Sequence, residues 1–113
     1  MNAKHRLSHS LDIKQVQQHG KSYAGTCVVI LVNDNQLEYS RFGVIASTAI
    51  GHAVQRNRAR RRIKECFNKL HAECVPRKDI LVIARRSINN VKFAELCSEM
   101  TRLLHKAGIM VKE

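Results

Sequence analysis

The side chains that stand out chemically in this sequence are basic residues crowded between positions 56 and 64. On a helix, like charges four residues apart, such as Arg56 and Arg60, destabilise each other by about 0.2–0.5 kcal/mol. The planar guanidinium group binds phosphate through paired hydrogen bonds. The run therefore predicts a nucleic-acid-binding helix face rather than an ordinary solvated one. The predicted binding residues are Arg56, Asn57, Arg58, Arg60, Arg61, Arg62 and Lys64.

The charge of the whole chain points the same way. Its 113 residues include 20 Lys and Arg against 9 Asp and Glu, which gives a formal net charge of +11. Such a surplus predicts an anionic partner, with nucleic acid as the first candidate. An anionic membrane is the second, but Trp is absent and the basic helix needs its apolar side for a core. Aromatic residues are sparse, so phosphate and shape contacts should outweigh base reading.

Catalytic residues are harder to find than binding residues. The acidic residues are scattered, with no close pair suited to two-metal nuclease chemistry. The histidines are dispersed too, and a histidine pair acting as general acid and base is the catalytic alternative that the sequence leaves open. We expect no catalytic residues in the protein itself.

The expected location of the protein determines whether its cysteines should be reduced or paired. No apolar run approaches the roughly 20 residues of a membrane-spanning helix, and residues 1–10 lack the apolar segment of a secretory signal. We therefore expect a cytoplasmic protein whose cysteines are reduced thiols that pack as small hydrophobes. The alternative is a zinc site formed by Cys66, His71 and Cys74, for which no fourth ligand is evident, so we predict no metal site in the protein.

The pattern of apolar residues predicts a single α+β domain over residues 1–113 with the order α-β-β-α-β-α. The first two strands should pair antiparallel because their connection is short, and the third should run parallel to the second after a helical crossover, normally right-handed. Ser10 is the predicted cap of the first helix, and Asn89 or Asn90 that of the last. The predicted elements are helix 11–19, strand 23–32, strand 38–47, helix 50–71, strand 79–84 and helix 91–107.

Each predicted helix has an apolar side that should face the core. In the long helix this side is opposite the basic residues. The last helix ends at Gly108. The apolar sets, helix by helix, are Leu11, Ile13 and Val16; Ala59, Ile63, Cys66, Phe67 and Leu70; and Phe93, Leu96, Cys97, Met100, Leu103 and Leu104.

The segment G-H-A-V-Q-R-N-R-A-R-R-R-I-K-E-C-F, residues 51–67, resembles the arginine-asparagine-arginine signature of the bacterial ribonuclease P protein subunit. Nearly the whole chain shares the resemblance, in the right order and at the right spacings. The other matching segments are Arg6-Leu7 with Asp12, His19-Gly20-Lys21-Ser22, Arg41-Phe42-Gly43-Val44 with Ser47, and residues 79–85.

This resemblance implies a fold and a function. The family fold is α+β, with a mixed sheet and a left-handed β-α-β crossover around the signature helix. The family protein is the small partner of a catalytic RNA that removes the 5′ leader from precursor tRNA using Mg²⁺, so the protein alone should be inactive. Its expected partners are that RNA and precursor tRNA, with no membrane and no obligate protein partner. Arg56, Asn57, Arg58, Arg60, Arg61 and Lys64 occupy the signature positions expected to face the catalytic RNA.

The resemblance also places a cleft for the single-stranded leader between the first helix and the sheet. Here the sequence departs from the family pattern. Ile13 and Gln17 stand where phenylalanines are common, and Leu31 stands where an aromatic residue is common, so packing or hydrogen bonding should replace base stacking. The alternative function is that of a structural RNA-binding protein of the ribosome or its assembly, which shares the basic face and needs no cleft.

Overall fold

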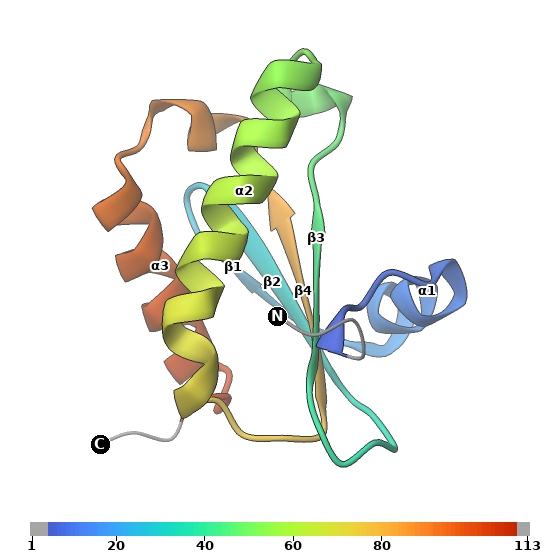
Figure 1. Ribbon diagram of the computed structural model, residues 1–113. Helices are drawn as coiled ribbons and strands as arrows, with labels where there is room; N and C mark the ends of the chain where they lie inside the picture. The colour runs from blue at the N-terminus through green and yellow to red at the C-terminus, as the bar shows by residue number, and fades with distance from the viewer. Residues whose placement is uncertain (1–4, 111–113) are drawn as a thin grey trace.

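A four-stranded mixed sheet organises the chain and carries helices on both faces (Figure 1). This computed structural model describes residues 5–110. The predicted α+β class is confirmed. The strands are β1 (Lys21–Ala24), β2 (Val28–Asp34), β3 (Arg41–Ile45) and β4 (Lys78–Ala84). The helices are α1 (Ser10–His19), α2 (Ala53–Leu70) and α3 (Phe93–Lys106), with short 3-10 helices η2 (Thr48–Ile50), η3 (His71–Glu73) and η4 (Arg86–Asn90).

The strand order is β1-β2-β4-β3, which differs from the sequence prediction. The predicted strand 23–32 is in fact a hairpin, because its chain turns between Ala24 and Val28 and β1 pairs antiparallel with β2. The Glu99 carboxylate holds this turn by accepting hydrogen bonds from the Cys27 and Val28 amides, at 2.8 and 3.0 Å. The predicted antiparallel pairing of residues 23–32 with residues 38–47 is wrong, because β4 lies between β2 and β3.

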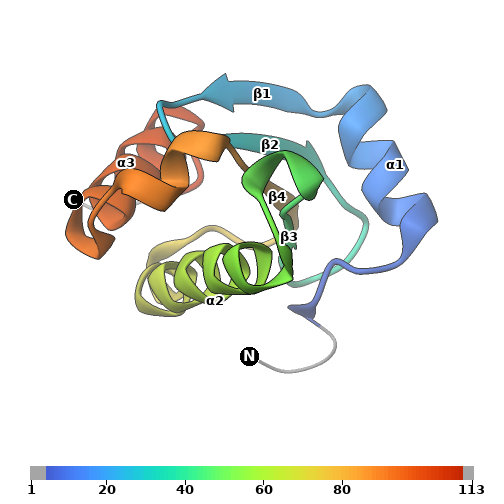
Figure 2. The same cartoon turned by 90° about the horizontal axis from the view of Figure 1, so that it is seen from above.

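The connection from β3 through α2 to β4 joins two parallel strands, as predicted. Seen from the α2 side with both strands pointing upward, β4 lies to the left of β3, so the crossover is left-handed (Figures 1 and 2). The usual right-handed preference therefore fails here, and the hand implied by the family resemblance is correct. One consequence is that α2 and α3 lie side by side on one face of the sheet, while α1 packs on the other (Figure 2).

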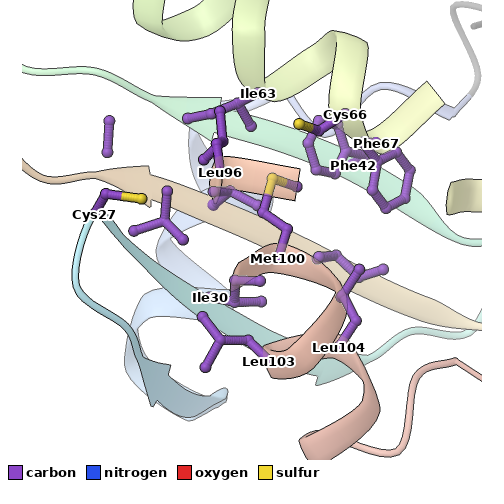
Figure 3. Packing of buried hydrophobic residues seen from close by; sticks show 14 of the residues in the cluster. Cys27, Ile30, Phe42, Ile63, Cys66, Phe67, Leu96, Met100, Leu103 and Leu104 are labelled. Atoms are coloured by element: carbon purple, nitrogen blue, oxygen red, sulfur yellow. The ribbon is translucent and has the colours of Figure 1, made fainter. Parts of the chain in front are cut away.

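Two apolar cores of unequal size lie on the two faces. The larger fills the space between the sheet and the α2–α3 pair, where Ile30, Ile63 and Met100 are fully buried (Figure 3). The smaller lies under α1 and consists of Leu7, Val16, Leu31 and Leu81. Because β2 and β4 are covered on both faces, their sequences are almost continuously apolar.

Helix ends differ in detail from the predicted caps. The Nδ1 atom of His9, rather than the Ser10 side chain, accepts a hydrogen bond at the start of α1. Helix α3 starts at Phe93, where Glu95 accepts from the Lys92 amide at 2.9 Å. Asn89, a predicted cap, instead donates its side-chain amide to the Ile50 carbonyl.

The cysteines are not all free thiols, contrary to the sequence prediction. Cys66 of α2 and Cys97 of α3 form a disulfide, while Cys27 and Cys74 are free. The prediction assumed only a reducing compartment, whereas helix packing brings the two Cα atoms to 5.4 Å, a separation that a disulfide spans. The alternative zinc site loses Cys66 to this bridge. Within residues 5–110 no helix is long and apolar enough to span a membrane.

Candidate RNA-binding surface

Helix α2 separates its apolar and basic side chains onto opposite sides. Ala59, Ile63, Cys66 and Phe67 are buried against the sheet and α3, as predicted, and Leu70 is half-buried. We call the polar side the basic face. It comprises Arg56, Asn57, Arg58, Arg60, Arg61 and Lys64, of which Arg56 and Arg60 are half-buried and the rest are exposed.

Arg58, Arg61 and Lys64 are the exposed cations of the basic face, and none of their side chains makes a hydrogen bond or ion pair among the described residues. The ion pairs within the described residues are Arg41–Asp12, Arg41–Asp79 and Lys78–Asp34, so none of them involves α2. Glu65 is exposed on the same helix, and the ion pairs of the described residues do not include one between Glu65 and Arg61. Two uncompensated guanidinium groups in solvent are suited to binding phosphate.

Hydrogen bonds within the protein hold Arg56, Arg60 and Asn57 of the basic face. Arg56 donates to the Gly51 carbonyl at 2.9 Å, and Arg60 donates to the Ala46 carbonyl at 3.3 Å. The second terminal nitrogen of Arg60 donates to the Asn57 side-chain oxygen at 2.6 Å. Asn57 therefore serves as a structural tie that orients Arg60. Guanidinium groups oriented in advance lose less conformational entropy when they bind.

Arg62 does not belong to the basic face, contrary to the sequence prediction. Its residue is only 9% exposed, and its guanidinium donates to the carbonyls of Ile88 (2.9 Å) and Val91. Burial lowers the pKa of this guanidinium, and the nearby charge of Arg58 lowers it further. The position was recognisable, because residue 62 lies three after Ala59 and four before Cys66 on the buried side. Arg62 fastens the η4 segment to α2.

Of the residues predicted for the leader cleft, two lie at the surface of α1 and one lies in the core. Gln17 is exposed and Ile13 is half-buried on α1. Leu31 is buried beneath α1 together with Val16 and Leu81, so it cannot offer a surface to a ligand and the prediction is wrong for this residue.

A row of apolar side chains beside α1 was missed by the sequence prediction. Val29 of β2 lies opposite Ile83 of β4, and Ile83 lies opposite Ile45 of β3. All three are half-buried and pack against the smaller core. We call Val29, Ile45 and Ile83 the apolar row. They lie two residues from Leu31, Leu81 and Gly43 in their strands, and this period of two placed them on the α1 side.

An ion-pair network fixes α1 beside this row. Arg41 donates to both carboxylate oxygens of Asp79, at 2.9 and 2.7 Å, and to Asp12 of α1 at 3.0 Å. Hydrogen bonding to Asp79 raises the pKa of Arg41. Asp79 is only 5% exposed and also accepts from Asn35. The network connects α1, β3 and β4 and so determines where Gln17 and Ile13 stand relative to the apolar row.

Comparisons with known proteins agree along nearly the whole chain. The family model described as Ribonuclease P matches residues 1–108. A ribonuclease P protein component from Geobacillus kaustophilus is 35% identical over 113 residues, which covers 99% of this chain and 93% of the relative. A solved RNase P protein from Staphylococcus aureus has a TM-score of 0.86 at 26% identity, covering 95% of this chain and 98% of that one. One from Thermotoga maritima has a TM-score of 0.81 at 26% identity, covering 96% and 98%.

Proposed function

The chain belongs to the bacterial ribonuclease P protein family, and on that premise we propose that it binds the catalytic ribonuclease P RNA and the 5′ leader of precursor tRNA. In this role it assists the Mg²⁺-dependent endonucleolytic removal of the leader in the cytoplasm. The observation that carries the proposal is the exposure of the Arg58 and Arg61 guanidinium groups, which form no ion pair within residues 5–110, on a helix that the family model covers. They are the contacts proposed for the catalytic RNA.

We assign the chemistry of cleavage to the RNA and its Mg²⁺. Among residues 5–110 no group of three or more His, Cys, Asp or Glu side chains converges in a way that could hold a metal ion. The buried carboxylate of Asp79 is already engaged by Arg41 and Asn35. The protein's contribution is then to bind and position RNA, and no other protein is needed for it.

The leader fits best along the apolar row and the exposed side of α1. The row offers aliphatic contact to bases, and the exposed Gln17 of α1 offers a hydrogen-bonding amide. No aromatic side chain belongs to the row, so stacking, which contributes about 1–3 kcal/mol per base where it occurs, is replaced by weaker aliphatic packing. Leader affinity should therefore depend mainly on backbone charge and little on base identity.

Reconstitution tests the proposal directly. Purified protein is mixed with ribonuclease P RNA and a 5′-labelled precursor tRNA at moderate Mg²⁺, and release of the leader is followed. We expect cleavage with RNA and protein together, and none with protein freed of RNA. Cleavage by the protein alone would contradict the assignment of chemistry to the RNA. A protein that binds the RNA without increasing leader removal would instead match the alternative of a structural RNA-binding protein, which no observation favours.

A further inference from the structure

A cavity of about 410 Å³ opens beside the C-terminal half of α2, away from the apolar row. Phe42 of β3 and Phe67 of α2 line it and stack on each other, with ring centroids 3.9 Å apart and planes inclined by 8°. Figure 3 shows this stacked pair at the edge of the larger core. The remaining lining residues are His5, Ser40, His71, Cys74, Val75 and Pro76. A volume of this size lies in the range typical of ligand sites.

A second, smaller cavity of about 190 Å³ adjoins the first through Phe42. It is lined also by Arg6, Lys64 and Asn68, so two cations line the smaller cavity. Arg6 comes from the segment that runs beside β3, where the Leu7 amide donates to the Phe42 carbonyl at 2.8 Å. The buried rings of Phe42 and Phe67 thus form the closed inner wall of the larger cavity, while Arg6 and Lys64 line the smaller one.

The cavity pair continues the basic face. Arg60, Lys64 and Asn68 follow one another at intervals of four residues along α2, with His71 three residues further on. Residues so spaced share one side of a helix. The Arg60 guanidinium reaches the Ala46 carbonyl just after β3, while Lys64 lies near Phe42 within that strand. An RNA strand that leaves the basic face along this side of α2 would reach the cavity.

The described residues that line the larger cavity include no Lys, Arg, Asp or Glu, which favours an uncharged ligand group. Burial and the neighbouring Glu73 raise the pKa of the Cys74 thiol to about 11, so the thiol is uncharged at neutral pH. The Oγ atom of Ser40 is already used, because it donates to the Val75 carbonyl and accepts from the Lys78 amide. The exposed imidazole of His71 makes no hydrogen bond within residues 5–110 and can pair with polar edges of a ligand.

We propose that this cavity pair receives one unpaired nucleotide of the catalytic RNA, with its base in the larger cavity beside the exposed imidazole of His71 and its phosphate on Arg6 and Lys64. The inference rests on the proposed function, since it takes the catalytic RNA as the source of the nucleotide. It adds a site for a single base to a surface that otherwise reads only phosphate and shape. Unpaired nucleotides are the usual elements through which proteins recognise RNA bases.

An amide-resolved NMR titration of the unmodified protein tests the base site. Adenosine monophosphate is compared with ribose 5-phosphate, which has the same phosphate and sugar but no base. We expect adenosine monophosphate to shift the amides of His71, Cys74 and Val75 in a saturable manner, and ribose 5-phosphate to leave them unchanged. Equal responses to the two compounds, or no response to either, would overturn the proposal.

Two lysines on α2 provide a matched test of the phosphate end. Lys64→Gln and Lys69→Gln remove the same charge from the same helix, but only Lys64 lines the cavity; the Lys69 ammonium lies over the Phe93 ring at 5.1 Å. We expect Lys64→Gln to raise the dissociation constant for adenosine monophosphate about tenfold, the loss of one charged hydrogen bond, and Lys69→Gln to leave it unchanged. Equal effects would show that only net charge matters and would overturn the phosphate assignment.

Binding to full-length catalytic RNA separates failure of this inference from failure of the proposed function. Cys74→Phe fills the cavity without removing a positive charge, so it should weaken RNA binding without changing its salt dependence. Arg61→Ala should instead reduce the salt dependence. If Cys74→Phe binds as tightly as the unmodified protein while Arg61→Ala binds less tightly, the cavity proposal is overturned and the proposed function stands. If neither variant changes RNA binding, both are overturned. Thermal melts check that Cys74→Phe folds, and the nucleotide titration decides the matter if it does not.

Discussion

Replacing Arg62 by Ala should destabilise the protein strongly, although the residue sits within a run of basic residues. The substitution removes two charged hydrogen bonds, to the carbonyls of Ile88 and Val91, and leaves both acceptors without that partner. Hydrogen bonds to charged groups contribute about 1.5–3 kcal/mol each, so the expected loss of unfolding free energy is about 3–6 kcal/mol. An unfolding entropy of about 2.1 cal/mol/K per residue over 113 residues converts each kcal/mol to about 4 °C. Even the lower bound then lowers Tm by about 13 °C.

The neighbouring residue supplies the control. Arg61→Ala makes the same chemical change one position earlier, on an exposed side chain with no hydrogen bond among the described residues. Its Tm should stay within about 2 °C of the unmodified value, while the slope of log affinity for catalytic RNA against log salt should fall by about one unit. Arg62→Lys should recover only part of the lost stability, because one ammonium group cannot reproduce the guanidinium fork.

Melting curves and RNA titrations across salt concentration would measure both effects. Arg62→Ala should melt early, and at temperatures where it remains folded it should keep the unmodified salt slope. The reasoning is refuted if Arg62→Ala melts like Arg61→Ala and lowers the salt slope instead. Arg62 would then contact RNA, and the η4 segment would be held by other means.

Other perturbations have equally definite outcomes. Ile63→Ala should lose about 2–5 kcal/mol of stability, because Ile63 is fully buried, and should keep the salt slope; a near-neutral urea midpoint would contradict this. Gln17→Ala should weaken binding of the leader only slightly and equally for all leader bases, whereas a large base-dependent loss in fluorescence titrations would show that Gln17 reads a nucleotide. Burial, reinforced by Glu99, raises the pKa of Cys27 to about 12 from 9.0, so folding favours the protonated thiol and stability should decline as pH rises above about 9, where the unfolded chain ionises; Cys27→Ala should flatten that decline in alkaline denaturation curves. Reducing the Cys66–Cys97 bridge, which spans 31 positions, should lower stability by about 4 kcal/mol on the loop-entropy model, and identical urea midpoints for oxidised and reduced protein would contradict it.

The structure could be predicted where apolar residues recur at one clear spacing along an element. The basic and apolar sides of α2 follow from the spacing of Ala59, Ile63 and Phe67, and the parallel relation of β3 to β4 follows from the helix between them. Strand order was not predictable in this way, because a short connection between residues 32 and 38 favours a hairpin, whereas the apolar sequence of β4 is satisfied only between two other strands. That choice depends on burial of the whole sheet rather than on any local signal.

The candidate site shows the same division. Arg58 and Arg61 could be assigned from charge alone, while Arg62 has the same charge and a different environment. The spacing to Ala59 and Cys66 places Arg62 on the buried side of α2. Its partners are the carbonyls of Ile88 and Val91, 26 and 29 residues away in sequence, and no pattern within the helix shows them. Leu31 and the apolar row lie on the same face of the sheet. Only the position of α1 decides that Leu31 is covered by the helix while the row stays half-buried. The disulfide likewise depends on how α2 and α3 pack.

The insertion of β4 between β2 and β3 has a consequence for synthesis of the protein on the ribosome. Until residues 78–84 are made, β2 has only β1 as a partner, and β3, α1 and α2 have no complete sheet on which to pack. Pairing Val28 with Ala84 joins residues far apart in sequence, and such non-local contacts form late and slowly. The nascent chain therefore exposes its arginines while the fold is still incomplete. An anionic strand bound during that interval would stabilise α2 before its sheet exists, so the RNA partner could act on folding as well as on the finished protein.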